Sequence, residues 1–399
     1  PIGPRPSWQM LTGKGCVFRR QPGAEATTDR AADQGCVKFP SNSPFCVLER
    51  CQPRAYSVAH AFAFQETPYS MDAKTLGRLQ ERLPEAHLSS RLMRQTEHVV
   101  MRFDVRTIRV FRFYWENFDL MPKVLGVVLS MTGLMEWARA NTLRYRLLEF
   151  EIPIEGLPQS FDGYRILHLS DLHIDEIRDG GELLCQTVAR LEYDLCVITG
   201  DYRFDTSGVF EETVERMSRL MEALKCPDGV VGILGNHDFI EMVPHLEGLG
   251  MKMLLNESLA IERGEHRIWL VGLDDAHYYE VADLARAIAN VDASEPVLLL
   301  VHSPEVIEQA EASGIDLYLC GHTHGGQVCL PGGIPIIGNA RCPRNKLSGR
   351  WRHGRMQGYT HRGTGASGLP VRINCPPDIT LHRLIPSPRP IAAKPGGGG

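Results

Sequence analysis

The chain has 399 residues, of which 43% are hydrophobic and 23% are charged. This is the composition of a globular protein, and it excludes wholesale disorder, while the length allows two or three folded units. Residues 1–150 carry 21 basic and 14 acidic side chains, whereas the remaining residues carry 22 basic and 34 acidic ones. An acidic half suits divalent cations, and an arginine-rich half suits phosphates or an anionic membrane surface.

The two ends of the chain are predicted to lie outside any folded domain. Residues 1–70 show no sustained periodicity and lack the basic, apolar and small-residue order of a signal peptide. We expect this segment to be disordered or to be translated upstream sequence, with a working start at or near Met71. Residues 387–399 are expected to form a disordered tail.

The eleven cysteines indicate the compartment. Their number is odd and their spacings are irregular, which argues against a secreted disulfide framework. Cys16, Cys36, Cys46 and Cys51 lie close together in the sequence, but their irregular gaps make a poor zinc site. We therefore expect a reducing compartment, the cytoplasm.

Residues 71–141 are predicted to form a helical extension, because leucines recur there at helical spacing. The longest apolar stretch, residues 120–137, is interrupted by Lys123 and Glu136. It is too short to span a bilayer, which takes about 20 apolar residues. Just before this stretch, four arginines recur at steps of four, three and three, which would align them on one helix face: Arg102, Arg106, Arg109 and Arg112.

Two interpretations of this extension remain open. In the first, the helices pack on the neighbouring domain and the arginine row is simply solvated. In the second, residues 102–137 form an amphipathic element that contacts lipid headgroups as a peripheral attachment at the inner membrane surface.

From about residue 142 the sequence predicts an α/β domain. Phe150, Ile152 and Ile154 alternate as in a strand, and short apolar runs then alternate with helical segments. Residues 253–273 are predicted to form antiparallel strands. This order implies a buried sheet with helices outside it, in which chemistry takes place at the carboxyl ends of the strands.

Five apolar strands of this domain are each followed by an aspartate, an asparagine or a histidine. A lone aspartate at such a place usually caps a turn, and a lone histidine is usually a satisfied polar side chain. Five together, expected at one edge of one sheet, indicate a site. The residues are Asp171 and His173, Asp201, Asn236 with His237 and Asp238, His302, and His322 with His324.

The types of side chain narrow the chemistry. Carboxylate, carboxamide and imidazole together suit divalent ions such as Mn, Fe, Zn or Co, and seven ligands suffice for two adjacent ions if one carboxylate bridges them. Gly200, Gly235 and Gly321 precede three of the polar residues and allow tight turns around a compact centre. A pair of metals activates water and clamps an in-line displacement, which predicts a hydrolase for phosphate esters.

The ordered motifs DLH, GD, GNHD, H and GHTH resemble those of the calcineurin-like metallophosphoesterases. The string GHTHGGQ and the later RGTGASGLPVRINCPPDI are similar to the bacterial membrane-associated branch of that family. The resemblance covers roughly residues 145–386, and it implies a four-layer α/β/β/α sandwich. The domain is placed at residues 142–386.

The resemblance also implies roles for individual residues. Asp171, His173 and His324 would hold one metal, and Asn236, His302 and His322 would hold the other. Asp201 would bridge both ions, and Mn is the expected metal. His237 would lie outside the ligand shell and act in catalysis by donating to the phosphate or protonating the leaving oxygen. Asp238 is expected to orient its loop, and His168 to be structural.

One departure from the superfamily pattern restricts the substrate. Phosphoprotein phosphatases carry GD-x-x-D-R-G at the second motif, whereas this chain reads GDYRFDTSG, with Asp205 one place late. The shorter motif is shared by phosphodiesterases and by the hydrolases that cleave UDP-2,3-diacylglucosamine. Three hypotheses follow: a lipid-linked diester or pyrophosphate hydrolase, a soluble cyclic-nucleotide or general phosphodiesterase, and a non-catalytic module. Nucleic-acid binding is not expected, and the sequence gives no indication of the oligomeric state.

Overall fold

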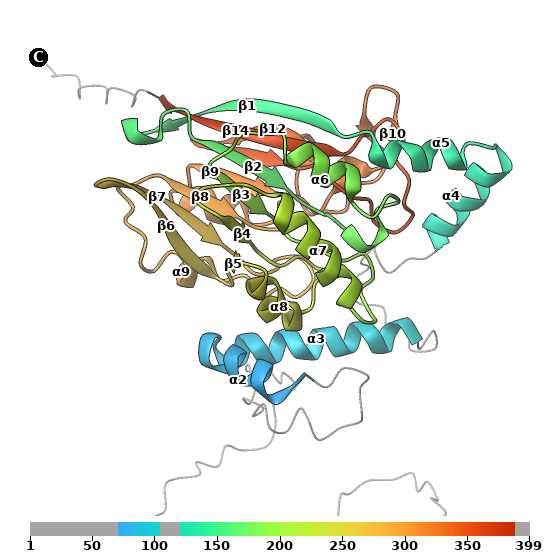
Figure 1. Ribbon diagram of the computed structural model, residues 1–399, viewed down its shortest axis with the longest axis horizontal. Coiled ribbons are helices and arrows are strands. Elements are labelled where there is room, and N and C mark those ends of the chain that lie inside the picture. Colours follow the sequence, from blue (N-terminus) through green and yellow to red (C-terminus); the bar gives the residue numbers. More distant parts are fainter. Residues whose placement is uncertain (1–70, 104–119, 388–399) are drawn as a thin grey trace, which may run out of the picture. The chain divides into compact units, whose positions relative to one another are not determined.

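Two six-stranded sheets lie face to face and carry helices on their outer sides (Figure 1). The computed structural model describes residues 71–103 and 120–387, all of which belong to one unit of the chain, residues 55–399. Arg106, Arg109 and Arg112 lie outside the described residues, as does the side chain of Arg102, so the predicted arginine row stays a prediction.

The first sheet has the strand order β1-β14-β2-β3-β4-β5. β1 runs parallel to β14, β14 runs antiparallel to β2, and β2 to β5 are mutually parallel. The strands are β1 (Arg146–Glu155), β14 (Asp378–Ser387), β2 (Arg165–Leu169), β3 (Leu195–Ile198), β4 (Val230–Gly232) and β5 (Met251–Met253).

The second sheet has the order β12-β13-β9-β8-β7-β6. Its four inner strands are parallel, and an antiparallel partner closes each edge. The strands are β12 (Gly349–His353), β13 (Met356–Thr360), β9 (Leu317–Cys320), β8 (Val297–Leu300), β7 (His266–Gly272) and β6 (Glu257–Arg263). The predicted antiparallel pair within residues 253–273 is therefore confirmed as β6 and β7. A short hairpin of β10 (Cys329–Leu330) and β11 (Ile334–Pro335) stands apart.

Three apolar clusters define the layers. One fills the space between the sheets, where Ile166, Val197 and Leu298 are fully buried. A second lies between the first sheet and the helices α6 (Glu182–Val188), α7 (Glu211–Ala223) and α8 (Val243–Gly248). The third lies under α9 (Leu284–Ala287) and α10 (Ile307–Ala312) on the second sheet. The four-layer α/β/β/α class is therefore confirmed.

The strands that precede the motif residues do not share one sheet. β2, β3 and β4 belong to the first sheet, whereas β8 and β9 belong to the second. The expectation that all five lie at one edge of one sheet is therefore wrong. The side chains still meet, because the parallel strands of both sheets end at the same edge of the sandwich.

The helices α2 (Ala73–Arg82) and α3 (Glu85–Phe103) pack on the helical layer of the first sheet. Asp72 caps α2 by accepting hydrogen bonds from the backbone N–H groups of Lys74 and Thr75, both at 2.9 Å. Three leucines of the two helices join the core cluster of that layer: Leu79, Leu83 and Leu88. This part of the extension is thus held by the domain.

The helices α4 (Leu120–Met131) and α5 (Met135–Ala140) have one packed face and one open face. Leu129 and Ala138 are buried against Val371. Six large apolar side chains point into solvent instead: Val124, Val127, Val128, Met131, Leu134 and Trp137. Within residues 71–103 and 120–387, no helix combines the length and the apolar character needed to cross a bilayer.

Three histidines lie side by side in the core between the sheets, with their rings tilted against one another. The rings of His168 and His361 are 4.9 Å apart, and those of His168 and His382 are 5.5 Å apart. His168 is fully buried and its Nε2 bonds the hydroxyl of Thr199 at 2.9 Å, which confirms its structural assignment. Burial holds the pKa of all three imidazoles below the ordinary range, and lowers that of His382 from 6.5 to about 3.

This group of three buried histidines predicts acid lability. Because the folded pKa of His382 lies below the unfolded one, protons bind the unfolded chain first, and stability present above pH 6.5 is lost as pH falls toward 3. Each histidine of this kind should contribute up to about 1.4 kcal/mol of lost stability per pH unit. Urea unfolding of metal-free protein between pH 7.5 and pH 5 measures how the free energy of unfolding changes with pH. From this slope follows the number of protons taken up on unfolding, which should be smaller by roughly one in His382→Phe. An unchanged slope would contradict the prediction.

Candidate metal centre

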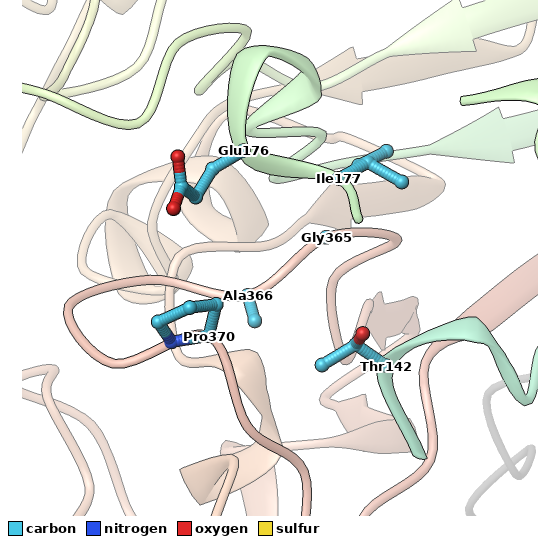
Figure 2. A pocket seen from close by; sticks show the side chains of 6 residues that line it. All are labelled: Thr142, Glu176, Ile177, Gly365, Ala366 and Pro370. Atoms are coloured by element: carbon cyan, nitrogen blue, oxygen red, sulfur yellow. The ribbon is translucent and has the colours of Figure 1, made fainter. Parts of the chain in front are cut away.

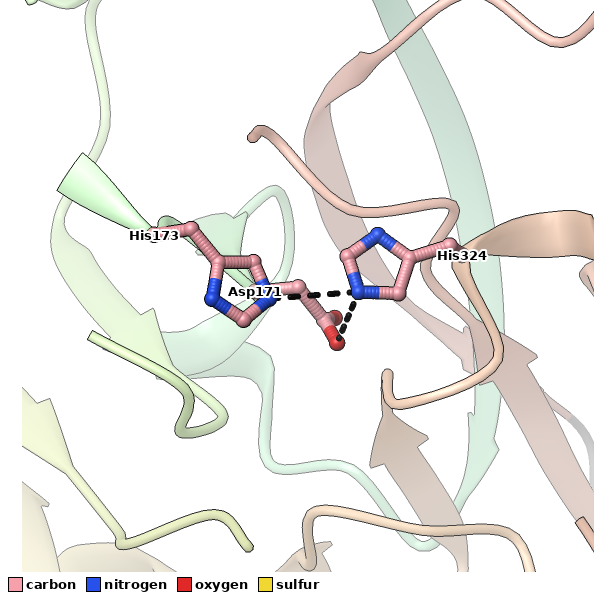
Figure 3. A group of neighbouring side chains, drawn as sticks. All are labelled: Asp171, His173 and His324. Carbon is pink, nitrogen blue, oxygen red and sulfur yellow. Dashed lines mark hydrogen bonds and ion pairs between the residues drawn. The ribbon is translucent and has the colours of Figure 1, made fainter. Parts of the chain in front are cut away.

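The first group of predicted ligands comes from the loops after β2 and β9. The Nε2 atoms of His173 and His324 are 3.3 Å apart, and His324 Nε2 lies 3.4 Å from Asp171 Oδ1 (Figure 3). All three side chains are buried, and their ligand atoms are close enough to hold one ion. The DLH and GHTH motifs are therefore brought together as predicted.

The second group comes from the loops after β3, β4, β8 and β9. His302 Nε2 lies 3.2 Å from Asp201 Oδ2. His302 Nε2 and His322 Nδ1 each lie 2.9 Å from the carboxamide oxygen of Asn236. The two imidazoles and the carboxylate again lie within the reach of one ion.

Asp201 lies between the two groups. Its Oδ2 is 3.2 Å from His302 Nε2 in one group and 3.8 Å from His173 Nε2 in the other. His237 Nε2 is 4.0 Å from the same oxygen. The backbone N–H of His237 also donates to Asp201 Oδ1 at 2.9 Å, so the GNHD loop is tied to the central carboxylate.

The backbone of the centre is strained. Five of the seven predicted ligands have a positive φ, which is uncommon outside glycine: Asp171 at 49°, His173 at 40°, Asp201 at 56°, His322 at 70° and His324 at 48°. Such conformations each cost of order 1–3 kcal/mol and gather at functional sites, where the surrounding structure imposes them. The folded state is therefore destabilised by the backbone conformations that point these side chains inward.

Two of the predicted glycines are needed because neighbouring ligands approach them closely. A Cβ on Gly235 would collide with the carboxylate of Asp201 and would lie 2.6 Å from its backbone nitrogen. A Cβ on Gly321 would collide with Ser170 and with the carboxylate of Asp171. The predicted role of these glycines, close approach around a compact centre, is confirmed.

We expect Gly235→Ala to weaken metal binding although it removes no ligand. The added methyl group would push Asp201 out of place, and displacement of a supporting group typically costs about 10- to 100-fold in metal affinity. Isothermal titration with Mn²⁺ measures the loss. Gly248→Ala is the matched control, since its Cβ would meet nothing within 4 Å. Wild-type affinity in Gly235→Ala would contradict the expectation.

Backbone carbonyls orient the imidazoles. The Nδ1–H groups of His173, His302 and His237 donate to the carbonyls of Arg203, Thr199 and Phe204 at 2.7, 2.7 and 2.6 Å. A carbonyl only accepts, so each ring carries its proton on Nδ1 and turns Nε2 toward the centre. This is the arrangement in which an outer partner fixes a histidine for metal binding.

The charges of the centre fit a divalent cation. Burial, with the neighbouring His237, lowers the pKa of His173 to about 3, and burial also holds that of His324 far below its usual range. Both rings are therefore neutral, which is the form in which an imidazole can bind a metal. Burial raises the pKa of Asp171 to about 6. Burial alone would lower the pKa of His302, but Asp201 raises it to about 10. Buried anions that draw protons in this way are stabilised by a metal instead.

Asp238 joins two of the loops. Its carboxylate accepts hydrogen bonds from the backbone N–H groups of Asp201 at 2.8 Å, Tyr202 at 2.9 Å and Gly235 at 2.8 Å. The loop-orienting role expected for Asp238 is confirmed by these three bonds.

Sequence reasoning missed the loop after β7, although the same strand-end rule applies to it. Asp274 and Asp275 follow the strand, and His277 reaches the centre, with its ring 4.2 Å from that of His322. The Nδ1 of His277 lies 2.8 Å from a carboxylate oxygen of Glu305. The signal that could have found this loop is the run DDAH directly after an apolar strand.

A small pocket lies behind the first motif rather than at the metal centre. It is lined by Thr142, Glu176, Ile177, Gly365, Ala366 and Pro370 (Figure 2). Gly365, which lines the pocket, donates its N–H to the carbonyl of Asp171 at 2.8 Å. A backbone hydrogen bond therefore connects the pocket wall to a residue of the centre. None of the seven predicted ligands lines it.

A four-layer sandwich with histidine, aspartate and asparagine gathered at its strand ends defines a class of metal-dependent phosphoesterases. Residues 164–326 match the family model described as calcineurin-like phosphoesterase. Residues 164–326 therefore form a calcineurin-like phosphoesterase domain, and the resemblance seen in the sequence motifs is confirmed.

Several relatives are named for the same domain. The uncharacterized metallophosphoesterase YkoQ of Bacillus subtilis is 27% identical over 238 residues, which are 58% of this chain and 86% of that protein. The phosphodiesterase YaeI of Escherichia coli is 29% identical over 234 residues, covering 56% of this chain and 82% of YaeI. A Danio rerio protein, "Transmembrane protein with metallophosphoesterase domain", is 28% identical over 280 residues, 65% of this chain but only 61% of that protein.

Proposed function

We propose that this protein hydrolyses a phosphodiester or pyrophosphate bond with a pair of divalent metal ions. The observation that carries the proposal is the position of Asp201, whose Oδ2 lies 3.2 Å from His302 Nε2 in one group and 3.8 Å from His173 Nε2 in the other. Asp171, His173 and His324 would hold one ion, and Asn236, His302 and His322 the other, with Asp201 shared. Mn²⁺ is the proposed metal. When bound, the ions would supply Lewis-acid activation of water and of the phosphoryl group.

The residues of the chain prepare this chemistry. The carbonyls of Arg203 and Thr199 hold the histidine rings so that Nε2 faces inward, and no reorientation is needed when the substrate arrives. His237 Nε2 faces the same space and carries a proton there only as the imidazolium ion. We propose that His237 donates to the phosphate or to the departing oxygen.

A screen of purified protein tests the reaction class. The wild type with Mn²⁺ should hydrolyse bis-p-nitrophenyl phosphate faster than p-nitrophenyl phosphate, and EDTA should abolish both activities. The relative YaeI is named a phosphodiesterase, which supports this order. Absence of turnover on any activated diester, with two metals bound, would overturn the proposal in favour of a non-catalytic module. UDP-2,3-diacylglucosamine and cyclic nucleotides are included to identify the substrate.

We further propose that the protein contacts the membrane surface of a reducing compartment through residues 102–137. The described part of this segment exposes apolar side chains on α4 and α5, with Met131 83% exposed and Val127 58% exposed. The β10–β11 hairpin continues the apolar surface through Leu330 and Ile334, and Val328 at its base packs with the cluster that holds α4 and α5. The described cysteines are free thiols, which supports a reducing compartment.

The occupant we propose for this surface is a lipid bilayer. A helix with an open apolar face that cannot span the membrane lies in the interface plane. Lys123 at the start of α4 is exposed and can stay among anionic headgroups. The relative from Danio rerio is named a transmembrane protein, which supports a membrane setting. A lipid-linked substrate would then reach the metal centre without leaving the bilayer surface.

Val127→Asp/Met131→Asp is expected to abolish binding to anionic vesicles, because two charges would have to enter the apolar layer. Co-sedimentation with phosphatidylcholine–phosphatidylglycerol vesicles measures this, and high salt should weaken wild-type binding if the arginine row contributes. Leu183→Asp, which alters an exposed leucine of α6, is the control. Hydrolysis of a small soluble diester should be unchanged in both variants. A wild type that ignores vesicles at low salt would end the membrane proposal.

A further inference from the structure

The helix α3 buries an arginine directly beneath the metal centre. Arg91 is fully buried, and its Nη1 lies 2.5 Å from Asp274 Oδ1 in the loop after β7. The centre of its guanidinium lies 3.9 Å from the middle of the Tyr279 ring. Burying an arginine is costly unless its charge is paired, and Asp274 supplies that pair in the core.

The second arm of the guanidinium contacts the loop that follows β4. Arg91 Nη2 donates to the carbonyl oxygen of Asp238 at 2.7 Å and to that of Gly235 at 3.4 Å. These two carbonyls stand immediately before and immediately after the dipeptide Asn236–His237. The guanidinium of Arg91 therefore binds the backbone on both sides of Asn236, a proposed ligand, and His237, the proposed catalytic histidine.

Asp274 is the counterion that offsets the cost of burying the charge of Arg91 in the core. Its other oxygen lies 2.7 Å from His87 Nε2, and its Oδ1 also accepts the backbone N–H of Asp275 at 2.7 Å. The pKa of Asp274 is kept low, because Arg91 and His87 outweigh the burial that would raise it. The guanidinium thus links the loop after β4 to the loop after β7, two of the loops that build the centre.

We propose that Arg91 is a positioning residue for the metal centre: it holds the backbone around Asn236 and His237 so that both side chains face the ions. The inference rests on the proposed roles of Asn236 and His237. A guanidinium suits the task, because its rigid fork reaches a carboxylate and two carbonyls at once, which a lysine cannot do. The N-terminal extension is then part of the catalytic apparatus.

The competing explanation is that Arg91 only fastens α3 to the domain. Arg82 provides the matched comparison. It lies at the end of α2 and pairs with Glu247 at 2.8 Å and with Glu257 at 2.6 Å. It also donates to the carbonyl of Met253 at 2.5 Å, and these three partners lie outside the 235–238 loop. Arg82→Ala therefore removes docking contacts of the helix pair and leaves the loop contacts intact.

The experiment compares Arg91→Ala, Arg91→Lys and Arg82→Ala in the full chain. Titration with Mn²⁺ alone should show roughly 10- to 100-fold weaker binding of one ion in both Arg91 variants, as for loss of an outer partner of a ligand. Arg82→Ala should bind both ions as the wild type does. Electron paramagnetic resonance should show the coupled dinuclear Mn²⁺ signal in the wild type and in Arg82→Ala, and its loss in Arg91→Ala.

Two further measurements separate positioning from folding. Guanidinium ion at non-denaturing concentration should restore Mn²⁺ binding to Arg91→Ala, whereas methylammonium should not. The double variant Arg91→Met/Asp274→Asn removes both buried charges, so that no charge is left uncompensated if it folds. We expect this double variant to fold and to show the same weakened binding of one Mn²⁺ ion as the single Arg91 variants. Wild-type Mn²⁺ affinity in a folded Arg91 variant, or unfolding of the single and double variants alike, would overturn the proposal. Because the readout is metal binding, a wild type without diesterase activity would refute the proposed function alone.

Discussion

Asp201→Asn is expected to lose bound metal and to lose turnover by about three orders of magnitude or more. The carboxylate lies 3.2 Å from His302 Nε2 and 3.8 Å from His173 Nε2, so it is the one anion that both proposed ions would share. An amide of the same shape keeps the packing but removes the negative charge that offsets two dications. Metal stabilisation of the reacting phosphate is worth several kcal/mol, which corresponds to a loss of this size.

Metal analysis of the purified variant, together with diester turnover, measures both effects. Asp228→Asn is the control, because that carboxylate is also largely buried but pairs with Arg263 at 2.5 Å, away from the centre. The control should keep both ions and full activity. A variant of Asp201 that retained two ions and the wild-type rate would exclude the bridging role.

Much of the site could be predicted because its signal is local. A polar residue directly after an apolar run is visible in the sequence, and the parallel strands of an α/β fold bring such positions together. Asp171, Asn236 and His322 were found in this way although their strands belong to two sheets. The backbone strain of the centre could be predicted only in part. The sequence shows the glycines before three of the motifs, but it does not show the positive φ of His173 and His324.

The contribution of α3 could not be predicted, for a physical reason. Arg91 acts on the carbonyls of Gly235 and Asp238, and every residue has a carbonyl, so the contact leaves no mark on the residue types around position 235. Arg91 also lies 144 residues before Gly235 in the chain. From sequence alone, only the row Arg102, Arg106, Arg109 and Arg112 was singled out, and it could be assigned only to solvent or to lipid. The structure adds a third role for arginines of the extension, since Arg82, Arg91 and Arg94 bind the domain.

His237→Ala is expected to keep both ions while losing roughly two to four orders of magnitude in turnover, the range that general acid catalysis contributes. The ring is fixed by donation from Nδ1 to the carbonyl of Phe204 at 2.6 Å, so only Nε2 faces the substrate space. His245→Ala, which alters an exposed histidine of α8, should have no effect. Turnover of a diester with a good leaving group, such as p-nitrophenolate, should fall less than that of an alkyl diester, because the good leaving group needs no proton.

The same variant tests the division between ligand and acid. The geometry also allows His237 to join His173 and Asp201 around one ion, since the three ligand atoms lie close together. His237 Nε2 lies 4.0 Å from Asp201 Oδ2 and His173 Nε2 lies 3.8 Å from it, so the metal content of the variant decides between the two roles. If His237→Ala bound only one Mn²⁺, His237 would be a ligand and another donor would have to protonate the departing oxygen. His277, held by Glu305 on the opposite side of the centre, would then be the residue to replace next.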